Sequence, residues 1–106
     1  MKKFILGWMT IADGERDTFL TEAQWMAEAT RAEEGCLFFE LNPSFTVPDL
    51  VLLMECFEDE AAHALHSKTP HQVWMNDHMK RFVVTSRVQI VYSDRITHHA
   101  ADNRPK

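Results

Sequence analysis

The stretch from Glu55 to Phe82 reads ECFEDEAAHALHSKTPHQVWMNDHMKRF, and it decides how the chain folds. Its first residues end an apolar run, LVLLMECF, which is typical of a strand, and a short helical segment follows. Thr69 and Pro70 then interrupt the pattern, because threonine is a favourable helix N-cap and proline is favourable in the first helical turn. The sequence therefore predicts a second helix that begins at Pro70.

This second helix carries a mixed set of side chains along one face. They recur at spacings of three and four residues, the period of an α-helix: His71, Trp74, Met75, His78, Met79 and Phe82. Such a stripe fits an ordinary hydrophobic core. It also fits the wall of a ligand pocket, which combines apolar surface with a few polar groups.

The composition indicates a single soluble globular domain. The chain has 106 residues, and its formal net charge of −5 argues against nucleic acid or an anionic membrane as the main partner, since both favour basic patches. No apolar run is long enough to span a bilayer, and the N-terminal apolar stretch is not followed by the small-residue cleavage site of a signal peptide. The two cysteines form no C-x-x-C motif and predict neither a disulfide framework nor a zinc knuckle. We expect a cytoplasmic protein.

The remaining elements follow from hydrophobic periodicity and from turn residues. Gly35 is expected to end the first helix in the left-handed conformation. Strands are predicted at residues 3–12, 36–41, 50–57 and 83–92, and the first helix at residues 15–34. The order β-α-β-β-α-α-β is that of an α+β, ferredoxin-like fold whose second crossover is split into two helices. The domain is expected to cover residues 1–96, and residues 97–106 to form a flexible tail.

The first three predicted strands are apolar on both faces. Helices can cover only one face of a four-stranded sheet, so the other face must be buried by something else. A second copy of the chain is the simplest cover. We therefore expect a homodimer packed sheet to sheet.

Three local patterns coincide in this chain. Glu34-Gly35-Cys36-Leu37 opens the second strand, Glu55-x-Phe57 closes the third, and Asp59-x-x-Ala62 precedes His66-x-x-Thr69-Pro70-His71. With this order of elements, the chain resembles the antibiotic biosynthesis monooxygenase family, whose dimeric ferredoxin-like α+β barrels include quinol monooxygenases. The resemblance covers residues 1–95.

The resemblance implies a small pocket in each protomer, between the helices and the covered face of the sheet. Members that oxidise polyphenols with O₂ need no metal or flavin, because a deprotonated hydroquinone or anthrone is electron-rich enough to reduce O₂ itself. The protein must hold the aromatic ring, accept a proton and stabilise the resulting oxyanion. The expected function is therefore cofactor-independent monooxygenation of a small hydroxylated aromatic substrate.

His66 and His71 match the family pattern and are the candidate catalytic residues, since neutral histidine accepts protons near pH 7. A structural role at the ends of two helices remains an alternative for both residues. His63 is expected to point to solvent. The expected pocket residues are Trp74, Trp25, Met75, His78 and Phe82, with core packing as their alternative role.

Glu55 ends an apolar strand, where burial would raise its pKa and allow it to relay protons. The favoured interpretation is structural, an interface pair with Arg87. No metal site is expected, because the histidines do not form an H-E-x-x-H motif or a two-histidine, one-carboxylate set on one element.

Three other functions are compatible with this fold. Haem-degrading relatives carry an asparagine in the first strand, a tryptophan where this chain has His66, and a haem-ligating histidine close to the position of Asn76. None of these matches, which disfavours haem degradation. An isomerase of a small carbonyl compound would need an anion site, and a non-catalytic ligand-binding stress protein would use the same pocket without turnover.

Overall fold

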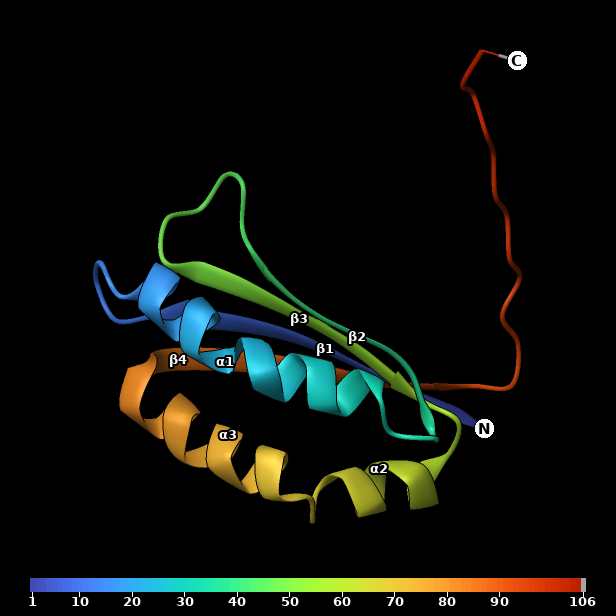
Figure 1. The fold of residues 1–106 in the computed structure, drawn as a ribbon, viewed down its shortest axis with the longest axis horizontal. Helices are drawn as coiled ribbons and strands as arrows, with labels where there is room; N and C mark the ends of the chain where they lie inside the picture. Colours follow the sequence, from blue (N-terminus) through green and yellow to red (C-terminus); the bar gives the residue numbers. More distant parts are fainter. Residues whose placement is uncertain (106) are drawn as a thin grey trace.

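Seven elements follow the order β-α-β-β-α-α-β in the computed structural model, which describes residues 1–105 (Figure 1). This order confirms the predicted α+β, ferredoxin-like fold, and the predicted boundaries differ from the observed ones by only a few residues. The elements are β1 (Lys2–Ile11), α1 (Arg16–Arg31), β2 (Cys36–Pro43), β3 (Leu50–Phe57), α2 (Glu60–His66), α3 (Pro70–Phe82) and β4 (Val83–Ser93).

The four strands form one antiparallel sheet in the order β2-β3-β1-β4. The first strand of the chain is therefore central, and it pairs with β3 on one side and with β4 on the other. Ile5 of β1 lies between Glu55 of β3 and Ile90 of β4. Because paired residues of adjacent strands point to the same side of a sheet, this register places Glu55 on the side that Ile5 faces.

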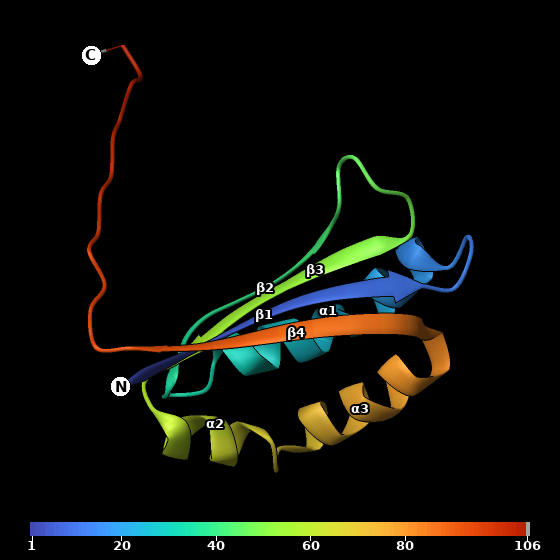
Figure 2. The ribbon, with the colours of Figure 1, turned by 180° about the vertical axis from the view of Figure 1, so that it is seen from behind.

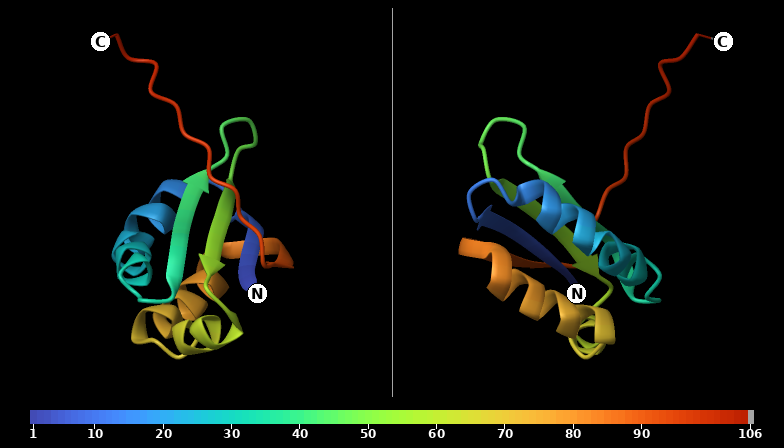
Figure 3. Two further views of the ribbon diagram at one scale, coloured as in Figure 1. Left: turned by 90° about the vertical axis from the view of Figure 1, so that its right-hand side faces the viewer. Right: turned by 60° about the vertical axis from the view of Figure 1, so that its left-hand side comes forward.

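The helices cover the side of the sheet to which Ile5, Met9 and Ile11 point, and these three residues are buried. In Figures 2 and 3 the helices lie on this one side of the sheet. The core is completed by a stripe on α1 that has the predicted helical spacing: Phe19, Ala23, Met26, Ala27 and Thr30. The stripe shows that the period of apolar residues correctly identified the buried face of this helix.

The opposite side of the sheet has no helix over it. It carries apolar side chains, among them Trp8, Met54 and Val91, and Met54 is 44% exposed. The edge strand β4 is exposed along both of its faces, since Val88 and Ile90 on the helix side are also about half exposed. Isolated soluble domains do not usually leave so much contiguous apolar surface open to water.

Gly35 is not in the left-handed conformation expected from the sequence; among the glycines, a positive φ occurs at Gly14. Instead, Gly35 lies against α2, and a Cβ atom added to it would stand 2.4 Å from the Cβ of Ala62. The amide of Glu58 also donates a hydrogen bond of 2.9 Å to the carbonyl oxygen of Gly35. Glycine is needed here because the start of β2 and the helix α2 approach so closely.

The segment after β4 runs away from the sheet without forming a helix or strand up to residue 105 (Figure 1). Residues 97–105 of the predicted tail belong to this segment, while Lys106 lies outside the described residues. Within the described chain, every helix is too short or too polar to cross a membrane.

Candidate functional site

A cavity of about 100 Å³ lies between the sheet and the helices. Four methionines dominate its wall, and its few polar groups gather on the side of α2 and β3. Its lining consists of Met9, Met26, Phe39, Leu41, Leu53, Glu55, His63, His66, Ser67, Gln72, Met75 and Met79. A largely apolar space with a few convergent polar groups is the usual form of a small-molecule site.

An open groove continues the cavity. The groove has a volume of about 550 Å³ and shares Met9, Leu53 and Met79 with the cavity wall. It runs between α3 and the part of the sheet formed by β1 and β4, where Gly7 and Val88 also line it. A ligand that enters the cavity can therefore extend into this largely apolar groove under α3, which Asn76, Lys80 and Ser86 also line.

The H-S-K-T-P-H segment turns the chain between α2 and α3. The Thr69 hydroxyl oxygen accepts a hydrogen bond from the Gln72 amide at 3.2 Å and donates one to the His66 carbonyl oxygen at 2.8 Å. Pro70 occupies the first turn of α3, as predicted. The capped turn leaves His66 at the end of α2 and His71 at the start of α3 with ring centroids 6.0 Å apart.

Glu33 joins the two histidines. It lies in the turn after α1, and its Oε2 accepts a hydrogen bond from His66 Nδ1 at 2.7 Å and another from His71 Nε2 at 2.8 Å. The side chain of His66 is 2% exposed, and those of His71 and Glu33 are largely shielded from solvent. One carboxylate oxygen therefore holds both candidate catalytic rings in a fixed orientation.

The shared carboxylate also decides where the ring protons lie. An ionised carboxylate only accepts hydrogen bonds, so the ring atoms facing Glu33 both carry hydrogen. In a neutral His66 ring this leaves Nε2 as the acceptor. Among residues 1–105, every side-chain nitrogen or oxygen atom that is fully buried has a hydrogen-bond partner. Nε2 of His66 has no partner within the chain, so this atom is not fully buried and reaches accessible space. Because His66 lines the cavity, we place this lone pair at the cavity wall.

Glu55 is the second polar group at this end of the cavity. It is 6% exposed, and burial, followed by the negative charge of Glu33, raises its pKa to about 7. The positive charge of Lys3 acts in the opposite direction and lowers the pKa of Glu55. The Lys3 ammonium group is itself bound by the Glu60 carboxylate at 2.8 Å. Below pH 7 the Glu55 side chain is therefore mainly a neutral carboxylic acid, which donates as well as accepts hydrogen bonds.

The sequence suggested that His63 points to solvent, but in the structure it faces the cavity. Its ring packs against Phe57 at a centroid distance of 5.1 Å and lines the cavity. Burial and the neighbouring positive charges lower its pKa, so it is neutral over most of the physiological range. His63 precedes His66 by three residues, which puts it on the same face of the seven-residue helix α2.

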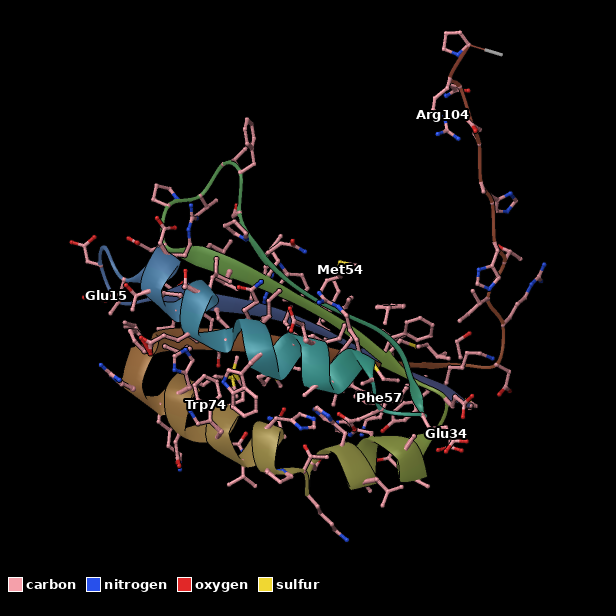
Figure 4. All side chains as sticks on the ribbon, viewed as in Figure 1. Glu15, Glu34, Met54, Phe57, Trp74 and Arg104 are labelled. Carbon is pink, nitrogen blue, oxygen red and sulfur yellow. The ribbon has the colours of Figure 1, made fainter. Side chains whose placement is uncertain are left out.

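The expected pocket residues are divided between two places. Met75 lines the cavity, whereas Trp74, Trp25, His78 and Phe82 lie outside its lining and pack α3 against α1. Trp74 points from α3 toward α1 in Figure 4, and its ring meets the Trp25 ring at 5.0 Å. His78 is buried, stacks on Phe19, and donates from Nε2 to the Phe19 carbonyl oxygen at 3.0 Å. His78 thus lies in the packing between α1 and α3 and outside the cavity lining.

Arg87 and Glu55 cannot pair within the chain, because they project from opposite faces of the sheet. Arg87 lies beside Trp8 on the uncovered face, with its guanidinium carbon 4.2 Å from the ring centroid. Such a contact is a cation–π interaction. Glu55 faces the cavity instead. The interface pair expected from the sequence would join two protomers and stays a prediction.

Glu33, His66 and His71 could also hold a metal ion. Their ligand atoms lie within 4.8 Å of one another, and two histidines with one carboxylate form a recognised metal-binding set. Motif spacing reveals such a set only where all three residues lie on a single element. Glu33 lies in a turn, His66 in α2 and His71 in α3, so their spacing in the sequence does not predict that they meet.

The chain was compared with known proteins. Residues 4–83 match the family described as antibiotic biosynthesis monooxygenase. YcnE of Bacillus subtilis (strain 168), which carries a provisional monooxygenase name, is 35% identical over 57 residues; the match covers 54% of this chain and 60% of YcnE. The chain thus spans about three fifths of the length of this relative.

Solved structures share the fold. The crystal structure of PA3566 from Pseudomonas aeruginosa superposes with a TM-score of 0.79 at 22% identity, over 91% of this chain and 95% of that one. Rv0793 from Mycobacterium tuberculosis superposes with a TM-score of 0.82 at 17% identity, over 92% of this chain and 100% of that one. At these identities the likeness shows a common architecture.

Proposed function

The chain belongs to the antibiotic biosynthesis monooxygenase family, and on this basis we propose that it is a cofactor-independent monooxygenase of small hydroxylated aromatic compounds, of the quinol or anthrone type. The observation that carries the proposal is the Glu33-His66-His71 cluster, which presents an acceptor nitrogen to a methionine-walled cavity. Methionine and phenylalanine walls suit a flat aromatic ring.

In the proposed reaction His66 accepts the hydroxyl proton of the bound substrate at Nε2. The imidazolium that forms is stabilised by Glu33, which also fixes the ring in the required tautomer. His71 holds Glu33 in place from the other side. The deprotonated substrate supplies the electrons that reduce O₂; one oxygen atom enters the product and the other leaves as water.

The cavity suits an uncharged substrate better than a phosphorylated one. Among the described residues no lysine or arginine lines it, while Glu55 and the nearby Glu33 are acids. A phosphate or carboxylate group would be repelled by an ionised Glu33. This favours a phenolic substrate over the phosphorylated carbonyl compound that an isomerase would use.

Oxygen uptake tests the proposal directly. Purified protein treated with a chelator, without added flavin, is expected to consume O₂ in the presence of at least one member of a panel of hydroquinones and anthrones. The same panel without protein gives the rate of autoxidation, which must be subtracted. Flat traces with every compound would contradict the proposal and favour a binding protein without turnover.

We also propose that the protein is a homodimer whose uncovered sheet faces pack together, in the cytoplasm, where Cys36 and Cys56 stay free thiols. The Met54→Glu variant places a charge on that face and is expected to give monomers in light scattering after gel filtration, because burying an unpaired carboxylate is costly. Leu65→Glu on α2, where Leu65 is 69% exposed, is the matched control and should leave the mass unchanged. A monomeric unchanged chain would contradict this assembly.

A further inference from the structure

The Glu55 carboxyl group has no hydrogen-bond partner among the described residues, although it is nine-tenths buried. It projects from β3 between Ile5 of β1 and Phe39 of β2, both of which are buried and apolar. In the described chain, every fully buried side-chain oxygen atom has a hydrogen-bond partner. The Glu55 oxygen atoms have none, so they must reach accessible space, and the cavity that Glu55 lines provides it. A buried polar group that is not satisfied by the protein calls for a partner from outside it.

His66 presents the complementary group. Glu33 holds the Nδ1 proton of His66, so that Nε2 at the cavity is an acceptor. Glu55 in its neutral form is a donor. Two groups of opposite hydrogen-bonding character thus line one cavity of about 100 Å³, which is close to the roughly 150 Å³ of an engineered cavity that binds benzene.

The charges around Glu55 favour its protonated form. Glu33 accepts a hydrogen bond from His66, and the other titratable groups around this end of the cavity are Cys36 and the histidines at positions 63, 66 and 71. Lys3 is the cation that faces this group from β1, and Glu60 neutralises it. Burial and this acidic surrounding together raise the pKa of Glu55 to about 7.

We propose that Glu55 acts as a protonated carboxylic acid that donates a hydrogen bond to the oxygen of an uncharged hydroxylated ligand, while His66, which lines the same cavity, accepts the ligand's hydroxyl proton. Together the two groups select a neutral phenol, because a carboxylate ligand carries no hydroxyl proton for His66 to accept. The assignment rests on the proposed function only in taking this cavity as the substrate site. The apolar body of the ligand extends into the groove under α3.

Ionisation of Glu55 removes the donor and adds a negative charge beside the ligand oxygen. The hydrogen bond from Glu55 therefore contributes to binding below the pKa of about 7, and this contribution is lost as the pH rises through it. A phenol stays neutral over this range, because the pKa of a phenolic hydroxyl is about 10. A loss of binding between pH 6 and pH 8.5 would thus report on the protein and not on the ligand.

Calorimetric titration with 4-propylphenol at pH 6 and at pH 8.5 tests the assignment. The unchanged chain is expected to bind at least about tenfold more weakly at pH 8.5, as expected for the loss of one hydrogen bond to a buried group. 4-Propylbenzoate, which has the same apolar body and a charged head, should bind at least about tenfold more weakly than the phenol at both pH values. Glu55→Gln keeps a donor of the same size at every pH, so it should bind the phenol equally well at both.

The outcomes are distinct. The assignment is overturned if the phenol does not bind, if its binding does not change with pH, if the benzoate binds as tightly, or if Glu55→Gln keeps the full pH dependence. In the last case the histidines would be the titrating groups. Phenol binding with the expected pH dependence but no oxygen uptake would refute the monooxygenase proposal and leave the role of Glu55 standing.

Discussion

Oxygen uptake by the His66→Ala/His71→Ala variant is expected to fall about 10²-fold or more below that of the unchanged chain, because a positioned general base contributes about 10²- to 10⁴-fold to a rate. The variant removes the acceptor nitrogen at the cavity wall and the second ring that fixes Glu33. The measurement is the initial rate of O₂ consumption at saturating substrate, after subtraction of autoxidation.

Glu33→Gln provides the sharper version of this test. The amide can donate as well as accept, so it no longer forces both ring atoms to carry hydrogen, and it does not stabilise a charged His66. We expect a loss within about tenfold of that of the double variant, and little further loss when all three changes are combined, since residues that act as one unit are not additive. Additive losses would show that the three residues act separately.

His98→Ala/His99→Ala is the matched control, because it also removes two histidines, both exposed in the segment after β4. Its rate should equal that of the unchanged chain. A similar fall in this control, or a double variant at positions 66 and 71 that keeps a third or more of the rate, would contradict the assigned base. Near-ultraviolet circular dichroism checks that each variant is folded.

Gly35→Ala is expected to lower the free energy of unfolding by about 3 kcal/mol, at the upper end of the cost of overpacking a tight contact. The new methyl group would stand 2.4 Å from the Cβ of Ala62, so α2 must move away from the start of β2. That movement would also separate His66 on α2 from Glu33, which precedes Gly35 by two residues. Urea denaturation at constant pH measures the effect.

A compensating change makes this prediction specific. Ala62→Gly removes the opposing methyl group at a cost of about 1 kcal/mol for glycine in a helix, so the double variant should recover most of the lost stability. Gly14→Ala is the control, because Gly14 has a φ of 75° and no atom within 4 Å of an added Cβ. It should cost about 1 kcal/mol through backbone strain, and Ala62→Gly should not rescue it. Equal behaviour of the two glycines would refute the contact with Ala62.

Most of the fold could be predicted from the sequence because its signals are local. The apolar stripe of α1 follows from helical spacing, and the start of α3 follows from Thr69 and Pro70, whose hydrogen bonds involve neighbouring residues only. The family patterns now have physical reasons as well. Asp59 caps α2 by accepting from the Ala62 amide at 2.8 Å, and Ala62 must be small because Gly35 lies against it.

The site was predictable only in part, because it depends on how distant elements cross. His66 and His71 are close to each other in the chain, and their meeting follows from one turn. Glu33 is more than thirty residues away, and nothing in its local sequence shows that a turn after α1 would place it between them. Similarly, the periodicity identified one face of α3, but Trp74, His78 and Phe82 of that face pack against α1, whereas Met75 and Met79 line the cavity.

The central place of β1 in the sheet has a consequence for how the chain acquires its structure. Of the four strands of the sheet, β1 is synthesised before the others and pairs with β4, which follows them, so that Lys2 must find Ser93 and Thr10 must find Thr85. Contacts between residues so far apart in sequence close a long loop and slow folding relative to proteins built from local contacts. Until β4 is synthesised, β1 keeps one unpaired edge, and in that interval the nascent chain is most exposed to aggregation.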